Sequence, residues 1–150
     1  MGGLQRAVAT GILALAAASV SLAAPPDDSA AVQAVVQSAY VEGVHAKGDA
    51  ALMRQGFHPE FRMLVLRDGK MSAVTLEEWI GRLEARNKEN PNAAKPTIKA
   101  EYPLINITDN AAVVRVELSR DGKRIFTDYL SLYKFPDGWK IVGKIFQSHP

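Results

Sequence analysis

Two side chains in the sequence could carry proton-transfer chemistry, an aspartate in the last third of the chain and a histidine near its middle. Asp128 lies in an alternating segment in which Phe126, Leu130 and Leu132 share its parity, and this set is more aliphatic than the residues between them. A carboxyl group in apolar surroundings is a candidate general acid or base, because desolvation disfavours its charged form. The alternative is that Asp128 lies at the rim of a sheet, paired with an arginine or capping a turn.

The histidine is His58, which directly precedes Pro59 at the start of a predicted strand. A histidine close to a carboxylate can exchange protons with it, so His58 and Asp128 are the candidate catalytic residues if the protein is an enzyme. Alternatively, His58 stabilises the turn before the proline by hydrogen bonding to the backbone. Arg62 could bind an anionic ligand group or pair with Asp128, and either role would leave it partly buried.

Three aromatic residues are candidates for a ligand-binding wall, namely Trp79, Tyr102 and Tyr40. A flat heterocycle could stack on Trp79 and Tyr102, and the Tyr40 hydroxyl could reach a pocket. The alternative for all three is ordinary packing in the core, with the Tyr40 hydroxyl at the surface.

The composition excludes several functional classes. Lys and Arg number 18 against 16 Asp and Glu, a net charge of +2, and the basic stretch 82–99 is interrupted by glutamates, so we expect no binding to nucleic acid. Cysteine is absent and the three histidines lack a metal-ligand spacing, so we expect no metal. Phosphate-binding loops, nucleophile elbows and zinc-protease motifs are also absent, and we expect no cofactor.

The N-terminal segment 1–24 has the layout of a secretory signal peptide. Arg6 precedes eighteen uncharged residues rich in Ala and Leu, and small residues precede a predicted cleavage site after Ala23. The alternative is an uncleaved anchor, although the many alanines would make membrane insertion weak. We expect an exported protein, periplasmic or secreted, without stable membrane insertion after cleavage. Residues 25–28 would form a linker and 29–150 one domain.

Hydrophobic periodicity predicts the order of the elements in this domain. A three- and four-residue spacing predicts a helix from Ser29 to Gly48, and a short helix follows. A capping box at Thr75 predicts the start of a third helix. Alternation and Asp-Gly turns predict a hairpin before it and a meander after it, with strands at 61–66, 71–74, 98–108, 111–120, 123–135 and 139–148. Segregated helices and strands indicate an α+β fold, with one face of an antiparallel sheet covered by helices.

This order resembles the nuclear-transport-factor-two-like superfamily, in which a strongly bent antiparallel or mixed sheet wraps an N-terminal helix to form a cone. The segments 57–63 and 126–146 are similar to the group named putative lumazine-binding proteins, and the resemblance covers residues 30–146. It implies a pocket between the concave sheet face and the helices. Related enzymes, such as scytalone dehydratase and the SnoaL-like polyketide cyclases, use histidine and aspartate in their pockets.

Two functions follow as expectations. The first is an exported protein that binds a small apolar or heterocyclic molecule without catalysis, as a homodimer through an outer sheet face bearing Tyr129, Tyr133 and Phe135. The second is a small lyase or isomerase, dehydratase-like or cyclase-like, that uses Asp128 and His58. We favour binding, because sequence spacing alone places no pair of ionisable residues together.

Overall fold

The computed structural model describes residues 28–150, and the predicted signal peptide lies outside the described residues. The first helix begins at Asp28, and residues 25–27 of the predicted linker also lie outside the described residues. The elements are helices α1 (Asp28–Val35), η1 (Val36–Lys47), α2 (Ala50–Gly56) and α3 (Leu76–Glu89), and strands β1 (Phe57–Arg67), β2 (Lys70–Thr75), β3 (Ile98–Thr108), β4 (Ala111–Arg120), β5 (Lys123–Phe135) and β6 (Gly138–Ser148).

Helices α1 and η1 form one continuous rod, because Val35 at their junction keeps α-helical backbone angles. Its second part is a π-helix, whose backbone bonds join residues five apart instead of four. The rod ends at Gly48, where φ is +66°, a left-handed conformation that glycine adopts without a steric penalty. The predicted helix is therefore present over its whole length, but the sequence pattern did not indicate its π-helical part.

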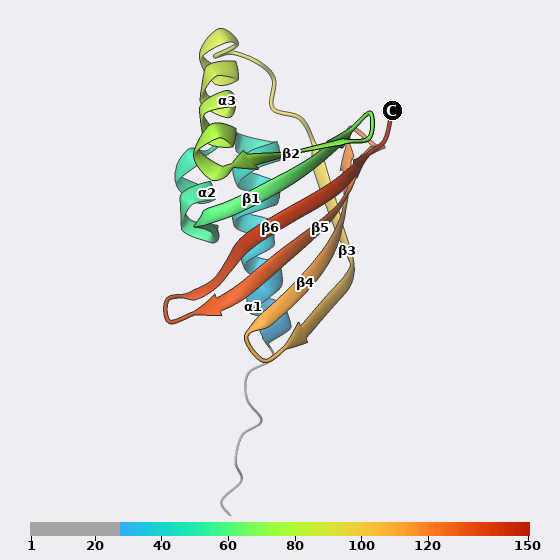
Figure 1. Ribbon diagram of the computed structural model, residues 1–150. Coiled ribbons are helices and arrows are strands. Elements are labelled where there is room, and N and C mark those ends of the chain that lie inside the picture. Colours follow the sequence, from blue (N-terminus) through green and yellow to red (C-terminus); the bar gives the residue numbers. More distant parts are fainter. Residues whose placement is uncertain (1–27) are drawn as a thin grey trace, which may run out of the picture.

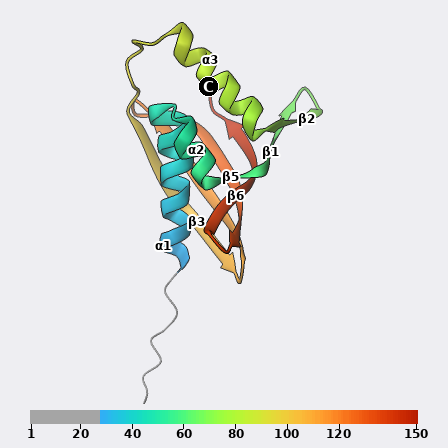
Figure 2. The same cartoon turned by 90° about the vertical axis from the view of Figure 1, so that its left-hand side faces the viewer.

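Six strands form one mixed sheet in the order β2-β1-β6-β5-β4-β3. Neighbouring strands are antiparallel except β1 and β6, which run parallel. Register shifts interrupt the pairing of β1 with β6, β3 with β4, β4 with β5 and β5 with β6. Such irregularities increase the local bend and twist of a strand. The sheet consequently curves around the helices, as Figures 1 and 2 show.

All helices lie on one side of the sheet, as Figure 2 shows, and α3 stands above α2 at the upper left of Figure 1, in contact with β1 and β2. Two of the three Asp-Gly pairs, at 68–69 and 121–122, hold both residues at positive φ and join β1 to β2 and β4 to β5 tightly. Thr75 begins α3 with the predicted capping box, in which its hydroxyl accepts from Glu78 N and the Glu78 carboxylate accepts from Thr75 N. The predicted α+β cone is confirmed, with a mixed, open sheet.

The concave side of the sheet and the inner faces of the helices form one apolar core. It includes Val36, Ile80, Leu118, Leu130 and Ile141, each nearly inaccessible to solvent. Within residues 28–150, no helix combines the length and the apolar character that crossing a lipid bilayer requires.

Candidate functional site

A cavity of about 260 Å³ lies between the concave sheet face, η1 and α3. Its wall is mostly apolar and aromatic, formed by Val44, Met63, Trp79, Leu83, Phe126 and Phe146. Tyr40, His45 and Lys144 bring polar groups to it from η1 and β6. An apolar wall with a few convergent polar groups is typical of a site for a small organic ligand.

The most strongly buried charges in the site are Asp128 on β5 and Lys144 on β6. Strand register places Asp128 opposite Phe146 and Leu130 opposite Lys144, so the two charged residues are diagonal neighbours on the concave face. Lys144 Nζ donates to Asp128 Oδ1 over 2.6 Å, and both side chains are almost completely inaccessible. The lysine also lies 3.9 Å from the centroid of the Phe146 ring. These contacts compensate part of the desolvation cost of the two charges.

Burial lowers the pKa of Lys144, and the adjacent Asp128 carboxylate opposes this change by favouring the charged form. Lys144 is therefore an ammonium group held by one carboxylate at the cavity wall. Its amine is easier to deprotonate than that of an exposed lysine, which is the property that carbonyl-attacking lysines share.

Tyr40 on η1 completes this polar cluster. Its hydroxyl group and Asp128 Oδ2 are both buried, and the hydroxyl is near enough to the Asp128 carboxylate for a hydrogen bond to contribute to its pKa. Burial raises the pKa of Tyr40 well above its usual value, and the negative charge of Asp128 raises it further. The hydroxyl therefore stays protonated and can donate a hydrogen bond to the Asp128 carboxylate.

His45 lies one π-helical turn after Tyr40, and the two rings meet edge to face with 4.9 Å between their centroids. Its Nε2 is buried and has no hydrogen-bond partner within residues 28–150. Burial lowers the pKa of His45 to about 3, and the positive charges of Lys144, Arg120 and Arg86 contribute to the shift. His45 is therefore neutral at pH 7 and offers the cavity an uncharged imidazole nitrogen.

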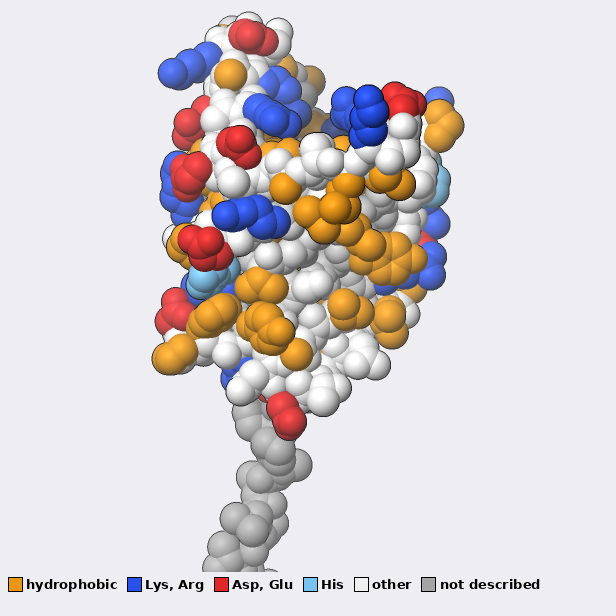
Figure 3. Space-filling model, in the orientation of Figure 1, with side chains coloured by type: hydrophobic (Ala, Val, Ile, Leu, Met, Phe, Trp, Pro, Cys, Tyr) orange, Lys and Arg blue, Asp and Glu red, His pale blue; other side chains and the backbone are white. Residues whose placement is uncertain are grey.

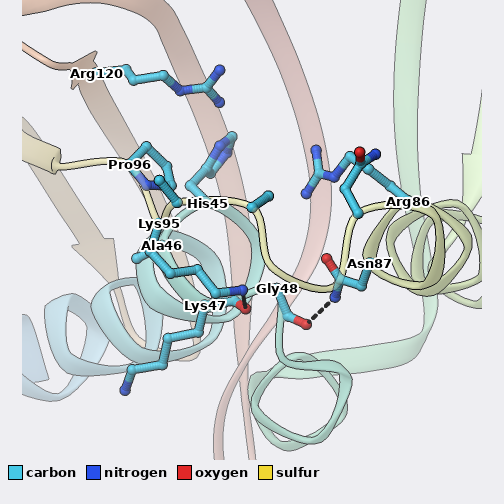
Figure 4. Close-up of a pocket in the computed structure, with 12 residues that line it drawn as sticks. His45, Ala46, Lys47, Gly48, Arg86, Asn87, Lys95, Pro96 and Arg120 are labelled. Atoms are coloured by element: carbon cyan, nitrogen blue, oxygen red, sulfur yellow. Dashed lines mark hydrogen bonds between the residues drawn. The ribbon is translucent and has the colours of Figure 1, made fainter.

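A second hollow, of about 380 Å³, shares His45, Arg86 and Arg120 with the cavity and forms its mouth. It lies between the end of η1, the end of α3 and the segment that leads to β3 (Figure 4). Asn87 Nδ2 donates to Gly48 O over 3.0 Å and Lys95 Nζ donates to Lys47 O over 2.9 Å. These bonds connect the segments that surround the mouth.

The structure does not bring His58 and Asp128 together. His58 stacks on Phe135, with 4.7 Å between ring centroids, and its Nδ1 accepts from Glu60 N over 3.1 Å. Phe135 lies seven residues beyond Asp128 on β5, roughly 23 Å along a strand. The predicted Asp128–His58 proton-transfer pair is therefore wrong, because His58 belongs to the opposite end of the sheet and stabilises its turn.

The other predicted ligand-binding residues divide between the cavity and the surface. Tyr40 and Trp79 line the cavity. Arg62 does not, because it lies on the outer sheet face with nearly half of its side chain exposed, and it donates to Phe61 O. Tyr102 lies outside the cavity lining and donates from its hydroxyl to Gln37 Oε1 over 2.7 Å, which attaches β3 to the helical rod.

Sequence reasoning did not identify His45, Lys144, Arg86 and Arg120 as members of the site. The alternation of β6 contained a signal for Lys144, since it shares parity with the half-buried Phe146 and lies opposite the inward-facing Leu130. His45 had no such signal, because the α-helical spacing places it away from Tyr40. Among residues 28–150, no group of three or more His, Asp or Glu is arranged to hold a metal ion.

Comparisons with known proteins agree with this architecture. The structure resembles an NTF2-like protein of unknown function from Shewanella baltica, with a TM-score of 0.65, 27% identity, and coverage of 81% of this chain and 93% of that one. An NTF-2-like protein of unknown function from Silicibacter pomeroyi gives a TM-score of 0.65 at 21% identity, covering 80% and 94% of the two chains.

Two sequence matches are more specific. Aldolase FrzH from Cladobotryum sp is 30% identical over 125 residues, which span 81% of this chain and 94% of that protein. The family described as "Putative lumazine-binding" matches residues 27–147, almost the entire described domain. The chain therefore belongs to this lumazine-binding-like family of the NTF2-like fold.

Proposed function

We propose that the protein is an exported, periplasmic or secreted, small-molecule-binding protein that holds an apolar or heterocyclic ligand in its cavity. The observation that carries the proposal is the cavity of about 260 Å³, whose wall is mostly apolar and aromatic and to which Tyr40, His45 and Lys144 contribute polar side chains. An apolar wall with a few convergent polar groups is typical of a site that binds a small organic ligand. Export is supported by the N-terminal sequence pattern alone.

A matched pair of substitutions tests the cavity. Val44 lines it, whereas Val113 lies on the outer sheet face. The proteins are screened by thermal shift against flat heterocycles, lumazine included, and small apolar metabolites. A compound that binds in the cavity should raise the Tm of the wild type and of Val113→Phe. Val44→Phe fills the cavity and should abolish the shift. An equal shift in both variants would place binding elsewhere and contradict the proposal.

The chain's two tryptophans provide a second measurement. Trp79 lies at the cavity wall, whereas Trp139 is buried outside it. In Trp139→Phe, a bound ligand should therefore change the emission of Trp79. Mass spectrometry of small molecules that co-purify with the protein would identify the natural ligand.

A second candidate function is aldol-type carbonyl chemistry, which the aldolase relative and Lys144 favour together. In this hypothesis Lys144 gives its proton to Asp128, and the neutral amine attacks the carbonyl carbon of a ketone or aldehyde. A C–N bond forms, and the carbinolamine loses its oxygen as water to give an imine. The imine can accept electrons from a breaking C–C bond in the retro-aldol direction.

Borohydride trapping tests this candidate. The protein is incubated with acetone or pyruvate and sodium borohydride, and the peptides are then mapped by mass spectrometry. Imine formation at the site predicts an alkylated Lys144 and unmodified exposed lysines such as Lys70 and Lys123. Modification of the exposed lysines without Lys144 would contradict the hypothesis and leave the binding function intact.

We also propose that the protein is a homodimer whose two copies associate through the outer face of the sheet. Tyr129, Tyr133 and Ile145 are 41%, 54% and 54% exposed there. Figure 3 shows apolar side chains gathered on this face. A second copy would cover them, since contiguous apolar surface typically marks an interface. Sedimentation should give a dimer for the wild type and a monomer for Tyr133→Lys, and a monomeric wild type would contradict the proposal.

A further inference from the structure

We propose that Arg86 and Arg120 form an anion-binding subsite at the mouth of the cavity, and that the ligand is an aromatic or heterocyclic acid whose carboxylate lies between them. This inference rests on the proposed binding function, because it assigns a chemical class to the ligand of the same cavity. The apolar body of the ligand would occupy the inner cavity beside Trp79, and its anionic end would face outward.

The first step is the charge balance around the mouth. Four cationic residues line it, and two of them have partners: Lys47 pairs with Glu42 over 2.7 Å, and Lys95 donates to a backbone carbonyl. The guanidinium groups of Arg86 and Arg120 have neither ion-pair nor hydrogen-bond partners within residues 28–150. No aspartate or glutamate of the described chain lines either hollow. The positive charge of these two arginines is therefore uncompensated.

The second step is their geometry. Arg86 lies in the last turn of α3 and Arg120 at the end of β4, so two separate elements bring them to one mouth. Figure 4 shows both side chains reaching toward His45 from opposite sides. A planar guanidinium group matches the two oxygens of a carboxylate, and a pair of them can hold one carboxylate from both sides.

The third step is the polarity between the mouth and the floor of the cavity. The inner cation, Lys144, is neutralised by Asp128 at 2.6 Å, and His45 is neutral. The potential is therefore positive at the mouth and close to balanced at the floor, which orients a ligand with its anionic end outward.

The experiment compares an acid with its neutral counterpart. Binding of 2-naphthoate and of 2-naphthamide is measured by isothermal titration calorimetry with wild type, Arg86→Gln, Arg120→Gln and the double variant. Arg82→Gln is the charge-matched control, because Arg82 is exposed on α3 and lines neither hollow. The two mouth arginines are also exposed, so the variants should fold, and circular dichroism checks this.

The expected result is that wild type and Arg82→Gln bind naphthoate at least tenfold more tightly than naphthamide. Each mouth variant should lose about tenfold in naphthoate affinity, with naphthamide affinity unchanged, and added salt should weaken only naphthoate binding. Equal binding of the two probes in all variants would overturn the arginine subsite and leave the binding function standing. Binding of neither probe to wild type would count against both.

Discussion

The buried Asp128–Lys144 pair leads to the sharpest stability prediction. Lys144 Nζ lies 2.6 Å from Asp128 Oδ1, and the side chains of Asp128 and Lys144 are 0% and 4% exposed, respectively. Lys144→Met would leave the Asp128 carboxylate in the core without a counter-charge. Removing one partner of such a pair costs about 3–5 kcal/mol in the free energy of unfolding, which lowers the Tm of a domain of this size by roughly 10–20 °C.

Replacing both residues should have a much smaller effect. In the double variant Asp128→Leu/Lys144→Met no charge remains buried, and the new side chains contact the apolar surroundings of Phe126 and Phe146. We expect the double variant to lie within about 1 kcal/mol of the wild type, because the desolvation cost of the pair disappears with its attraction.

Urea unfolding followed by circular dichroism of Lys144→Met, Asp128→Leu and the double variant yields the coupling energy of the pair. The matched control is Lys47→Met, which breaks an ion pair of similar length, 2.7 Å, whose lysine is 57% exposed. An exposed pair contributes less than about 1 kcal/mol. Should Lys144→Met cost no more than Lys47→Met, or the double variant lose the sum of both single losses, the reasoning from burial would be refuted.

Three further predictions concern the frame around the site. His45 has a folded-state pKa of about 3 against 6.5 in the unfolded chain, so the unfolded state binds the proton first and stability falls as the pH drops from 6.5 toward 3. Between pH 7 and 4.5 the wild type should lose about 2–3 kcal/mol more than His45→Gln in urea unfolding, and parallel profiles would contradict the neutral buried imidazole. Gly56→Ala would place a Cβ 2.3 Å from the Cβ of Ala39 and should lower the free energy of unfolding by about 1–3 kcal/mol. The added Cβ in Gly81→Ala meets nothing within 4 Å, so this control should raise the Tm. A Tm gain in both variants would contradict the close approach of α2 to η1. Thr75→Ala removes the capping box of α3 and should cost about 1 kcal/mol, with an unchanged Tm as the contrary result.

Much of the fold could be predicted from local patterns. The Asp-Gly turns, the capping box at Thr75 and the alternation of β4 and β5 each follow from a few neighbouring residues, and they place five of the six strands within one residue of their observed bounds. The exception is β1, which begins at Phe57, four residues before the predicted start. The parallel pairing of β1 with β6 could not be predicted in this way, because it joins segments about eighty residues apart.

The candidate site shows the same division more clearly. Alternation along β5 offered an inward-facing Asp128 as one of two alternatives, and the structure buries it. Its partner depended on the register between β5 and β6, which the sequence does not reveal. His58 was chosen for its type and its position near a strand start, and the sheet carries it to the end opposite the cavity.

By itself, the sequence determined the order of the elements and the apolar character of the core, because these depend on local propensity and periodicity. Only the tertiary structure decided which polar groups meet. In an α-helix, residues five apart point about 140° away from each other at roughly 100° per residue. The wider π-helical turn of η1 instead places His45 beside Tyr40, where the bent sheet adds Lys144 and the ends of α3 and β4 add two arginines.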